Sequence, residues 1–233
     1  MALWSGQLRG IAINFLFPSR CVGCGNAGDF LCEKCYRNLP RITPPICDKC
    51  GRPESTGVLC PTCWGWQSRI DGIRSPFRFE GVIRQAIHEL KYHNLKTISG
   101  RLAELLFNYL KTNPVSGDVL VSVPLHNRRL WQRGYNQSTL IVKELSQLTA
   151  LPVVEGCLCR LKDSPPQART KTADERRRNV VGAFTCVDQR LSGKQVLLID
   201  DVCTSGATLE ACAAALKFAG VLSVWGLTLA RET

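Results

Sequence analysis

Two adjacent carboxylates followed by a turn of small hydroxyl residues are the part of this sequence best suited to chemistry. Asp200 and Asp201 come directly after the branched apolar run 196–199. The turn that follows them consists of Val202, Cys203, Thr204, Ser205, Gly206, Ala207 and Thr208. Because these side chains are small, backbone N–H groups and the positive end of the next predicted helix can surround a phosphate, while carboxylates accept hydrogen bonds from a diol. We therefore expect residues 200–208 to bind a phosphorylated ribose.

A second group of residues that can bind anions follows the predicted strand 119–123. Arg128 and Arg133 lie in the segment 125–137, which we expect to be a loop, and planar guanidinium groups match the oxygens of a pyrophosphate. Ligand loops of open α/β sheets share one edge, so we place this loop beside the acid pair. The alternative is that both arginines are solvated surface residues. His126 fits an anion ligand and a structural histidine equally well.

Eight of the thirteen cysteines form four C-x-x-C pairs within the first 63 residues. Two thiolates on a tight turn converge on one tetrahedral metal, which favours zinc over disulfides in a reducing compartment. The pairs also repeat, since a C-x-x-C-G pair is twice followed by an L-C-x-x-C pair. We predict two structural zinc sites, one on Cys21, Cys24, Cys32 and Cys35 and the other on Cys47, Cys50, Cys60 and Cys63. An interleaved arrangement, in which the first pair joins the third, uses the same residues.

The elements that must position these residues alternate between helix and strand. Apolar periodicity predicts helices over 81–92, 98–110, 137–148 and 209–218, and strands at 119–123, near 153, at 183–187, 196–199 and 224–229. This alternation predicts an α/β fold in which a mostly parallel sheet carries helices on both faces. We expect residues 1–66 to form an N-terminal helix and a double zinc ribbon, and residues 67–233 to form the α/β domain. The polar segment 162–179 is predicted to be a lid or a surface loop, and Lys91 and Tyr92 to cap and pack their helix.

Length and composition exclude several classes of protein. At 233 residues and 45% hydrophobic content, the chain can bury a core and is not a disordered protein. Its formal charge of +11 favours nucleic acid or phosphate-rich small molecules as partners. The apolar stretch 3–17 is too short and too polar to span a bilayer, and no signal-peptide cleavage site follows it. We expect an amphipathic helix there and a cytoplasmic protein without stable membrane insertion.

Residues 196–208 resemble the 5-phosphoribosyl-1-pyrophosphate (PRPP) signature of type I phosphoribosyltransferases, which joins an apolar strand, Asp-Asp and a Thr/Ser-Gly-x-Thr loop. A Walker B acid pair would require a G-x-x-x-x-G-K-[ST] loop, which this sequence lacks. The four cysteine pairs, R-x4-R-G-Y-N-Q at 128–137, E-L-K-Y at 89–92, and Gln167 with R-x2-N-V-x-G-A-F at 176–184 together resemble the ComF/GntX family. The resemblance implies a cytoplasmic protein linked to natural competence or to the use of external DNA, with a type I phosphoribosyltransferase-like domain.

Two functions fit these features. In the first, Mg²⁺-PRPP binds with its pyrophosphate against Arg128 and Arg133, and the protein transfers the phosphoribosyl group. Asp200, Asp201, Arg128 and Arg133 are then the catalytic residues, acting by positioning and by neutralising the leaving group, without a protein nucleophile. In the second, the protein is not a catalyst and PRPP is a regulatory ligand. The zinc ribbons, with Trp64 among their aromatic residues, then hold single-stranded DNA or a DNA-uptake protein.

Overall fold

The computed structural model describes residues 19–162 and 182–233. The predicted N-terminal helix at 3–17 and nearly all of the predicted lid at 162–179, with Gln167, lie outside the described residues. Within the described part of the chain, no helix is long and apolar enough to cross a membrane.

A parallel sheet forms the centre of the fold. Its strands are β1 (Gly72–Arg74), β2 (Phe77–Arg78), β3 (Val119–Ser122), β6 (Gln195–Cys203) and β7 (Ser223–Arg231). The order is β1-β7-β6-β3, β2 also pairs with β7, and every pairing is parallel. Side chains of β6 alternate between two cores, since Leu197 and Ile199 belong to one hydrophobic cluster and Val196 and Leu198 to the other. The run of apolar residues in β6 is therefore explained by burial on both faces.

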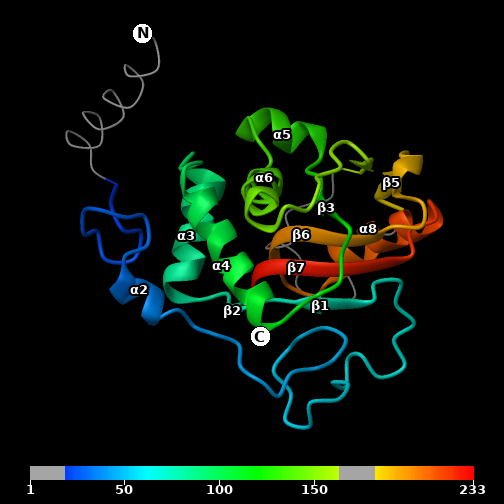
Figure 1. Cartoon of the computed structure of the whole chain (residues 1–233), viewed down its shortest axis with the longest axis horizontal. Helices are drawn as coiled ribbons and strands as arrows, with labels where there is room; N and C mark the ends of the chain where they lie inside the picture. The colour runs from blue at the N-terminus through cyan, green and yellow to red at the C-terminus, as the bar shows by residue number, and fades with distance from the viewer. Residues whose placement is uncertain (1–18, 163–181) are drawn as a thin grey trace.

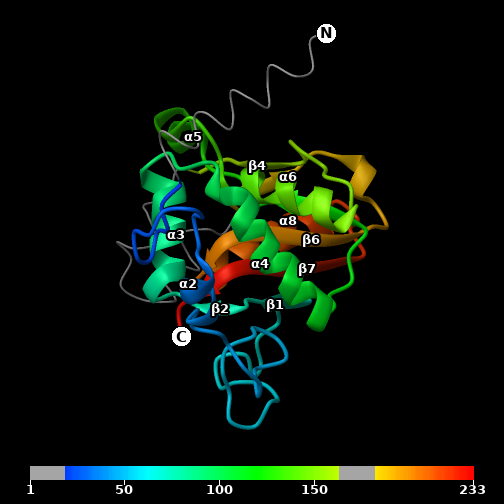
Figure 2. The ribbon, with the colours of Figure 1, turned by 60° about the vertical axis from the view of Figure 1, so that its left-hand side comes forward.

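Helices cover both faces of this sheet (Figures 1 and 2). They are α3 (Gly81–Tyr92), α4 (Ile98–Thr112) and α6 (Gln137–Thr149) on one face and α8 (Ala207–Phe218) on the other. The apolar spacing of α4 buries Leu102, Leu105 and Leu106 against the sheet. Helix α6 begins after Asn136, whose side chain accepts a hydrogen bond from the Ser138 N–H. The predicted α/β fold, a mostly parallel sheet with helices on both faces, is confirmed.

The segment 125–137 is not a loop throughout, and that expectation was wrong. Residues Asn127–Arg133 form the short helix α5, which has no buried residue. The His126 side chain caps its first turn by accepting a hydrogen bond from the Arg128 N–H, and the helix ends at Gly134. These caps stabilise a helix that hydrophobic periodicity does not reveal.

Two further strands lie apart from the main sheet. β4 (Leu158–Arg160) and β5 (Phe184–Cys186) pair antiparallel with each other, and the short 3-10 helix η2 (Gln189–Leu191) follows them. The strand predicted near Val153 is only an isolated parallel bridge to Leu120.

Two cysteine-rich segments precede the sheet in the sequence; the first lies against a helix and the second against a strand (Figures 1 and 2). The first ribbon, residues 20–37, includes α2 (Glu33–Arg37) and lies beside α3, where Gly23 approaches Val82 closely. The second ribbon, residues 46–64, lies along β1, whose Ile73 N–H donates to the Lys49 carbonyl at 2.8 Å.

Candidate functional site

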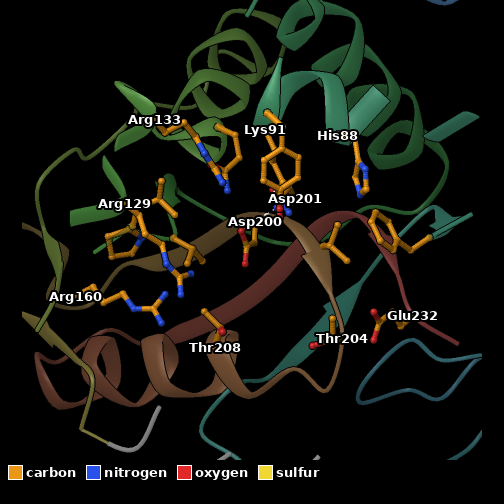
Figure 3. Close-up of a pocket in the computed structure, with 17 residues that line it drawn as sticks. His88, Lys91, Arg129, Arg133, Arg160, Asp200, Asp201, Thr204, Thr208 and Glu232 are labelled. Atoms are coloured by element: carbon orange, nitrogen blue, oxygen red, sulfur yellow. Dashed lines mark hydrogen bonds and ion pairs between the residues drawn. The ribbon is translucent and has the colours of Figure 1, made fainter. Parts of the chain in front are cut away.

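A cavity of about 240 Å³ lies at the carboxyl ends of β3 and β6 (Figure 3). Its charged and hydroxyl-bearing lining residues are Lys91, Tyr92, Arg129, Arg133, Arg160, Asp200, Asp201, Thr204, Thr208 and Glu232. In Figure 3, Arg129 and Arg160 lie on one side of Asp200, and Thr204 and Glu232 lie on the other. The edge of the sheet predicted to bind the ligand is therefore hollow, and both cationic and acidic side chains line it.

The two acids that line this cavity have different bonding partners. Asp201 is 4% exposed, and its Oδ2 lies 2.8 Å from the Nζ of Lys91. Asp200 Oδ1 accepts hydrogen bonds from the Ser138 hydroxyl at 3.0 Å and from the Asp201 N–H at 2.9 Å. One carboxylate is thus paired with a cation and the other is held by neutral donors.

This asymmetry affects ionisation of the pair. Burial and the charge of Asp201 raise the pKa of Asp200 to about 7, although Lys91 and the Ser138 hydroxyl act in the opposite direction. The pair therefore retains a proton over part of the neutral range when no ligand is bound. A cation or a hydrogen-bond donor brought by a ligand favours the form in which both acids are ionised.

Strand β6 extends beyond the predicted end at residue 199 and includes both acids. The turn after it follows Cys203, the last residue of the strand, and Gly206, with φ of 80°, caps the twelve-residue helix α8. A left-handed conformation at this position suits glycine, and the first N–H groups of a helix have no partner within the helix itself. The predicted phosphate cradle is thus a strand end followed by a helix N-terminus.

The side chains of this turn have separate tasks. Thr204 and Thr208 line the cavity, whereas the Ser205 hydroxyl accepts a hydrogen bond from the Ala207 N–H at 3.4 Å and supports the turn itself. Cys203 is buried, and burial raises the pKa of its thiol. The Cys203 sulfur therefore stays protonated, which agrees with the expectation that it is not a nucleophile.

Helix α5 places only some of its arginines at the cavity. Arg133 lines it, as does Arg129, while Arg128 is exposed and is not among the lining residues. Because α5 is helical, adjacent residues point in directions about 100° apart, so Arg129 rather than Arg128 turns inward. Two roles were proposed for His126, and the structure shows the structural one: its side chain caps α5.

Lys91 is the functional residue that the sequence reasoning missed. It lies in the last turn of α3 as predicted, and the ion pair with Asp201 gives it a contact beyond capping and packing of that helix. Nothing local marks it, because its partner lies far along the chain, and only the E-L-K-Y motif of the family resemblance included it. His88, one turn earlier on α3, also lines the cavity; burial and the charge of Arg84 lower its pKa, so its imidazole is neutral at pH 7.

The R-G-Y-N-Q motif acts by positioning. The Tyr135 hydroxyl donates to the carbonyl of Leu90, directly before Lys91, and the Asn136 side-chain amide donates to the Val123 carbonyl at 2.9 Å. These contacts join the ends of α3 and β3 to the start of α6. They therefore fix the cation of Lys91 relative to the acid pair.

The eight paired cysteines gather into two sets. The ligand sulfurs of each set lie within 4.8 Å of one another, and the sets are Cys21, Cys24, Cys32, Cys35 and Cys47, Cys50, Cys60, Cys63. The grouping is sequential, which settles the choice against the interleaved arrangement. Four thiol ligands at this spacing suit a structural zinc ion in each set.

The internal repeat is present in the backbone as well. Gly25 N–H donates to the Cys21 carbonyl and Gly51 N–H to the Cys47 carbonyl, both at 2.8 Å. In each ribbon an amide also donates to the first sulfur at 3.4 Å, from Cys32 to Cys21 and from Cys60 to Cys47. Burial opposes ionisation of these two thiols, yet such N–H donors lower the pKa of Cys21 to about 6 and of Cys47 to about 7. Thiolates that are favoured in this way bind metal readily.

Comparison with known proteins gives matches to both parts of the chain. Residues 12–64 match the double zinc ribbon domain family. Competence protein F of Haemophilus influenzae is 30% identical over 232 residues, which cover 94% of this chain and 100% of that protein. Competence protein ComFC of Bacillus subtilis is 30% identical over 210 residues, covering 87% and 84%, and DNA utilization protein YhgH of Escherichia coli K12 is 29% identical over 205 residues, covering 84% and 89%.

Solved structures give only weak similarity. Glutamine PRPP amidotransferase from B. subtilis, complexed with ADP and GMP, has a TM-score of 0.39 at 20% identity and covers 57% of this chain and 26% of that one. A hypothetical protein from Neisseria gonorrhoeae with bound ppGpp has a TM-score of 0.36 at 17% identity, covering 57% and 66%. The sequence matches decide the assignment, since competence protein F is similar over its whole length and the double zinc ribbon is present. The chain belongs to the ComF/GntX family.

Proposed function

We propose that the cavity at the end of β6 binds Mg²⁺-PRPP or a related phosphorylated ribose, in a protein that serves DNA uptake or utilisation. One observation carries this proposal: two carboxylates, a hydroxyl-lined helix N-terminus and several cations share a single cavity. A bare anion does not need the acids, and a metal alone does not need the arginines. A sugar with phosphates at both ends needs all three.

Each part of the ligand has a counterpart in the chain. The 5-phosphate binds the turn from Thr204 to Thr208, where N–H groups and the dipole of α8 favour an anion. The ribose diol donates to Asp200 and Asp201. The magnesium ion that accompanies PRPP is a hard cation suited to carboxylate and phosphate oxygens, and it neutralises the pyrophosphate.

The pyrophosphate binds the arginine side of the cavity. Arg133 lines the cavity and keeps the role proposed for it, and Arg129 takes the place of Arg128 as its neighbour within the cavity. In a transfer reaction the bond from the anomeric carbon to the pyrophosphate oxygen breaks and positive charge develops on the ribose. Catalysis then comes from holding the reactants and stabilising the leaving group, in keeping with the protonated state of Cys203.

A second candidate function is PRPP-dependent binding without transfer. It is favoured by Trp64 on the second ribbon, whose side chain is 77% exposed and is therefore able to stack on a base. In this function the ribbons hold single-stranded DNA, and PRPP bound in the cavity regulates that binding.

Calorimetric titration with Mg²⁺-PRPP tests the common part of both functions. We expect saturable binding to the wild type and its loss in the double variant Asp200→Asn/Asp201→Asn. Asp188→Asn is the matched control, because Asp188 pairs with Arg190 at the surface and does not line the cavity. An absence of saturable heat with the wild type would show that the proposal is wrong.

Two assays then separate the candidates. Release of pyrophosphate from PRPP in the presence of candidate bases supports transfer. Retention of labelled single-stranded DNA that decreases with salt and is weakened in Trp64→Ala supports the binding function.

A further inference from the structure

Arg231 connects the second ribbon to the sheet. It is the last residue of β7, is 1% exposed, and donates through Nη1 to the carbonyl of Cys50, one of the four cysteines of the second set. Its Nε has no hydrogen-bond partner among the described residues, and no carboxylate within them forms an ion pair with it. Burying a guanidinium group without a carboxylate is unfavourable, so its surroundings must supply compensation.

The same residue lies beside the phosphate turn. In the sheet register Arg231 is opposite Cys203, directly before the turn, and the Glu232 N–H donates to the Cys203 carbonyl at 2.9 Å. Glu232 itself lines the cavity. The positive charge of Arg231 is therefore placed at the base of the turn that we propose to hold the 5-phosphate, and a bound phosphate compensates it.

A second path runs from the second ribbon to the turn through β1. Residues between the zinc ligands Cys47 and Cys50 hold this strand: the Lys49 carbonyl accepts from the Ile73 N–H at 2.8 Å, and the Asp48 carbonyl accepts from Arg74 Nη1 at 3.0 Å. The Ile73 side chain in turn packs against Gly206, since a Cβ at Gly206 would lie 3.1 Å from its Cδ1. Both paths begin at the same metal-binding turn.

The first ribbon has no such path within the described residues. Its closest contacts are with α3 and α4, through Val82 and through the ion pair between Asp29 and Arg101 at 3.8 Å. None of the hydrogen bonds of residues 20–37 reaches the turn at 203–208 in the described part of the chain.

We propose that the second ribbon and the phosphate turn are one coupled unit, joined by Arg231, in which zinc and the phosphorylated ligand stabilise each other. The first zinc site is independent of the ligand. The inference rests on the proposed ligand of the cavity. Coupling between two sites is reciprocal and commonly amounts to about 5- to 150-fold, so the ligand must tighten the second zinc site as much as zinc tightens the ligand.

Zinc release from the full-length protein tests this coupling. Zinc transfer to the indicator chelator 4-(2-pyridylazo)resorcinol is followed with and without saturating Mg²⁺-PRPP. We expect two phases in the wild type, one unchanged by PRPP and one slowed by about five-fold or more. The double variant Asp200→Asn/Asp201→Asn, which lacks the ligand site, controls for zinc binding by PRPP itself and is expected to show no slowing.

Variants assign the effect to Arg231. Arg231→Met removes the donor to Cys50 and is expected to abolish the slowing, while Arg231→Lys keeps a cationic donor and restores part of it. Arg101→Met, beside the first ribbon, is the matched control, and PRPP is expected to slow its zinc release as much as in the wild type. If PRPP slowed zinc release in Arg231→Met as much as in the wild type, the proposed role of Arg231 would be wrong.

The outcomes also separate this inference from the proposed function. If calorimetry shows PRPP binding but neither zinc phase changes in the wild type, the coupling is wrong and the ligand assignment stands. If PRPP does not bind, both are wrong. Because the wild type alone decides these cases, the test does not depend on the folding of any variant.

Discussion

The two zinc ribbons share a local structure and differ in what they contact. In both, a glycine follows the first cysteine pair, and the same main-chain donors support the first sulfur. In the first ribbon Cys24 is exposed, whereas all four cysteines of the second are buried. The first ribbon packs side chains on a helix, and the second attaches its main chain to the sheet edge at Ile73.

This difference teaches that the repeat determines metal binding but not the role of the metal. Residues outside the repeat determine where each ribbon is attached. Val82 and Arg101 contact the first ribbon, while Arg231 and β1 contact the second. A duplicated unit thus contacts helices in one copy and the sheet edge in the other, and we propose that only the second copy supports the ligand site.

The largest expected effect comes from removing one zinc ligand in each ribbon. Cys47→Ser should release the second zinc, lower the free energy of unfolding by on the order of 3–5 kcal/mol, and weaken PRPP binding by about 5- to 150-fold. Cys24→Ser, at an exposed ligand, should cost less and leave PRPP binding intact. Zinc content, urea unfolding and calorimetry measure the three quantities. Equal loss of PRPP binding in both variants would break the comparison.

A matched glycine pair measures the docking contact itself. Gly25 and Gly51 occupy equivalent positions with φ of 76° and 70°, but a Cβ at Gly51 would lie 2.5 Å from the Ile73 carbonyl oxygen, and a Cβ at Gly25 meets nothing within 4 Å. Gly25→Ala should cost about 1 kcal/mol from backbone strain alone, and Gly51→Ala about 3 kcal/mol. Unfolding in urea gives both values. A difference near zero would mean that the second ribbon is not held at β1.

The pH dependence of stability separates the cavity from the ribbons. In the unfolded chain Asp200 has its ordinary pKa of 3.8, and in the fold its pKa is raised to about 7, so its folded form holds an extra proton between these values. Its contribution to stability is therefore lost as the pH rises through this window, whereas zinc thiolates lose theirs as the pH falls. Asp200→Asn should remove the decrease in stability between these pH values and stabilise the free protein by up to about 4 kcal/mol above pH 7.

The smallest effect is expected at the ion pair of the first ribbon. Asp29 is half-exposed and lies 3.8 Å from Arg101, so Asp29→Asn should change the free energy of unfolding by at most about 0.5 kcal/mol. PRPP binding should be unchanged. A clear loss of PRPP affinity in this variant would show that the first ribbon is also coupled to the cavity.

The sequence was sufficient wherever the signal is local. The eight zinc ligands follow from spacing alone, and the strand before Asp200 follows from its apolar run. The parallel sheet follows from the alternation of elements. In these cases the physical cause lies within a few residues, and the predicted grouping of cysteines and the fold class are confirmed.

Features that depend on distant partners could not be predicted in this way. Lys91 has no local mark, because its role is created by the approach of α3 to Asp201. Arg129 replaces Arg128 in the cavity because α5 is a helix, which capping rather than periodicity stabilises. Arg231 is the last residue of a strand, and its hydrogen bond to the Cys50 carbonyl depends on a residue far away in the sequence.

The position of β1 at the edge of the sheet has a consequence for aggregation when metal is scarce. It is the outermost strand of its sheet, and the Lys49 carbonyl covers its outward Ile73 N–H. An uncovered edge recruits strands from other chains and begins aggregation. Loss of the second zinc is therefore expected to uncover this edge, and the protein should aggregate more readily after treatment with a chelator.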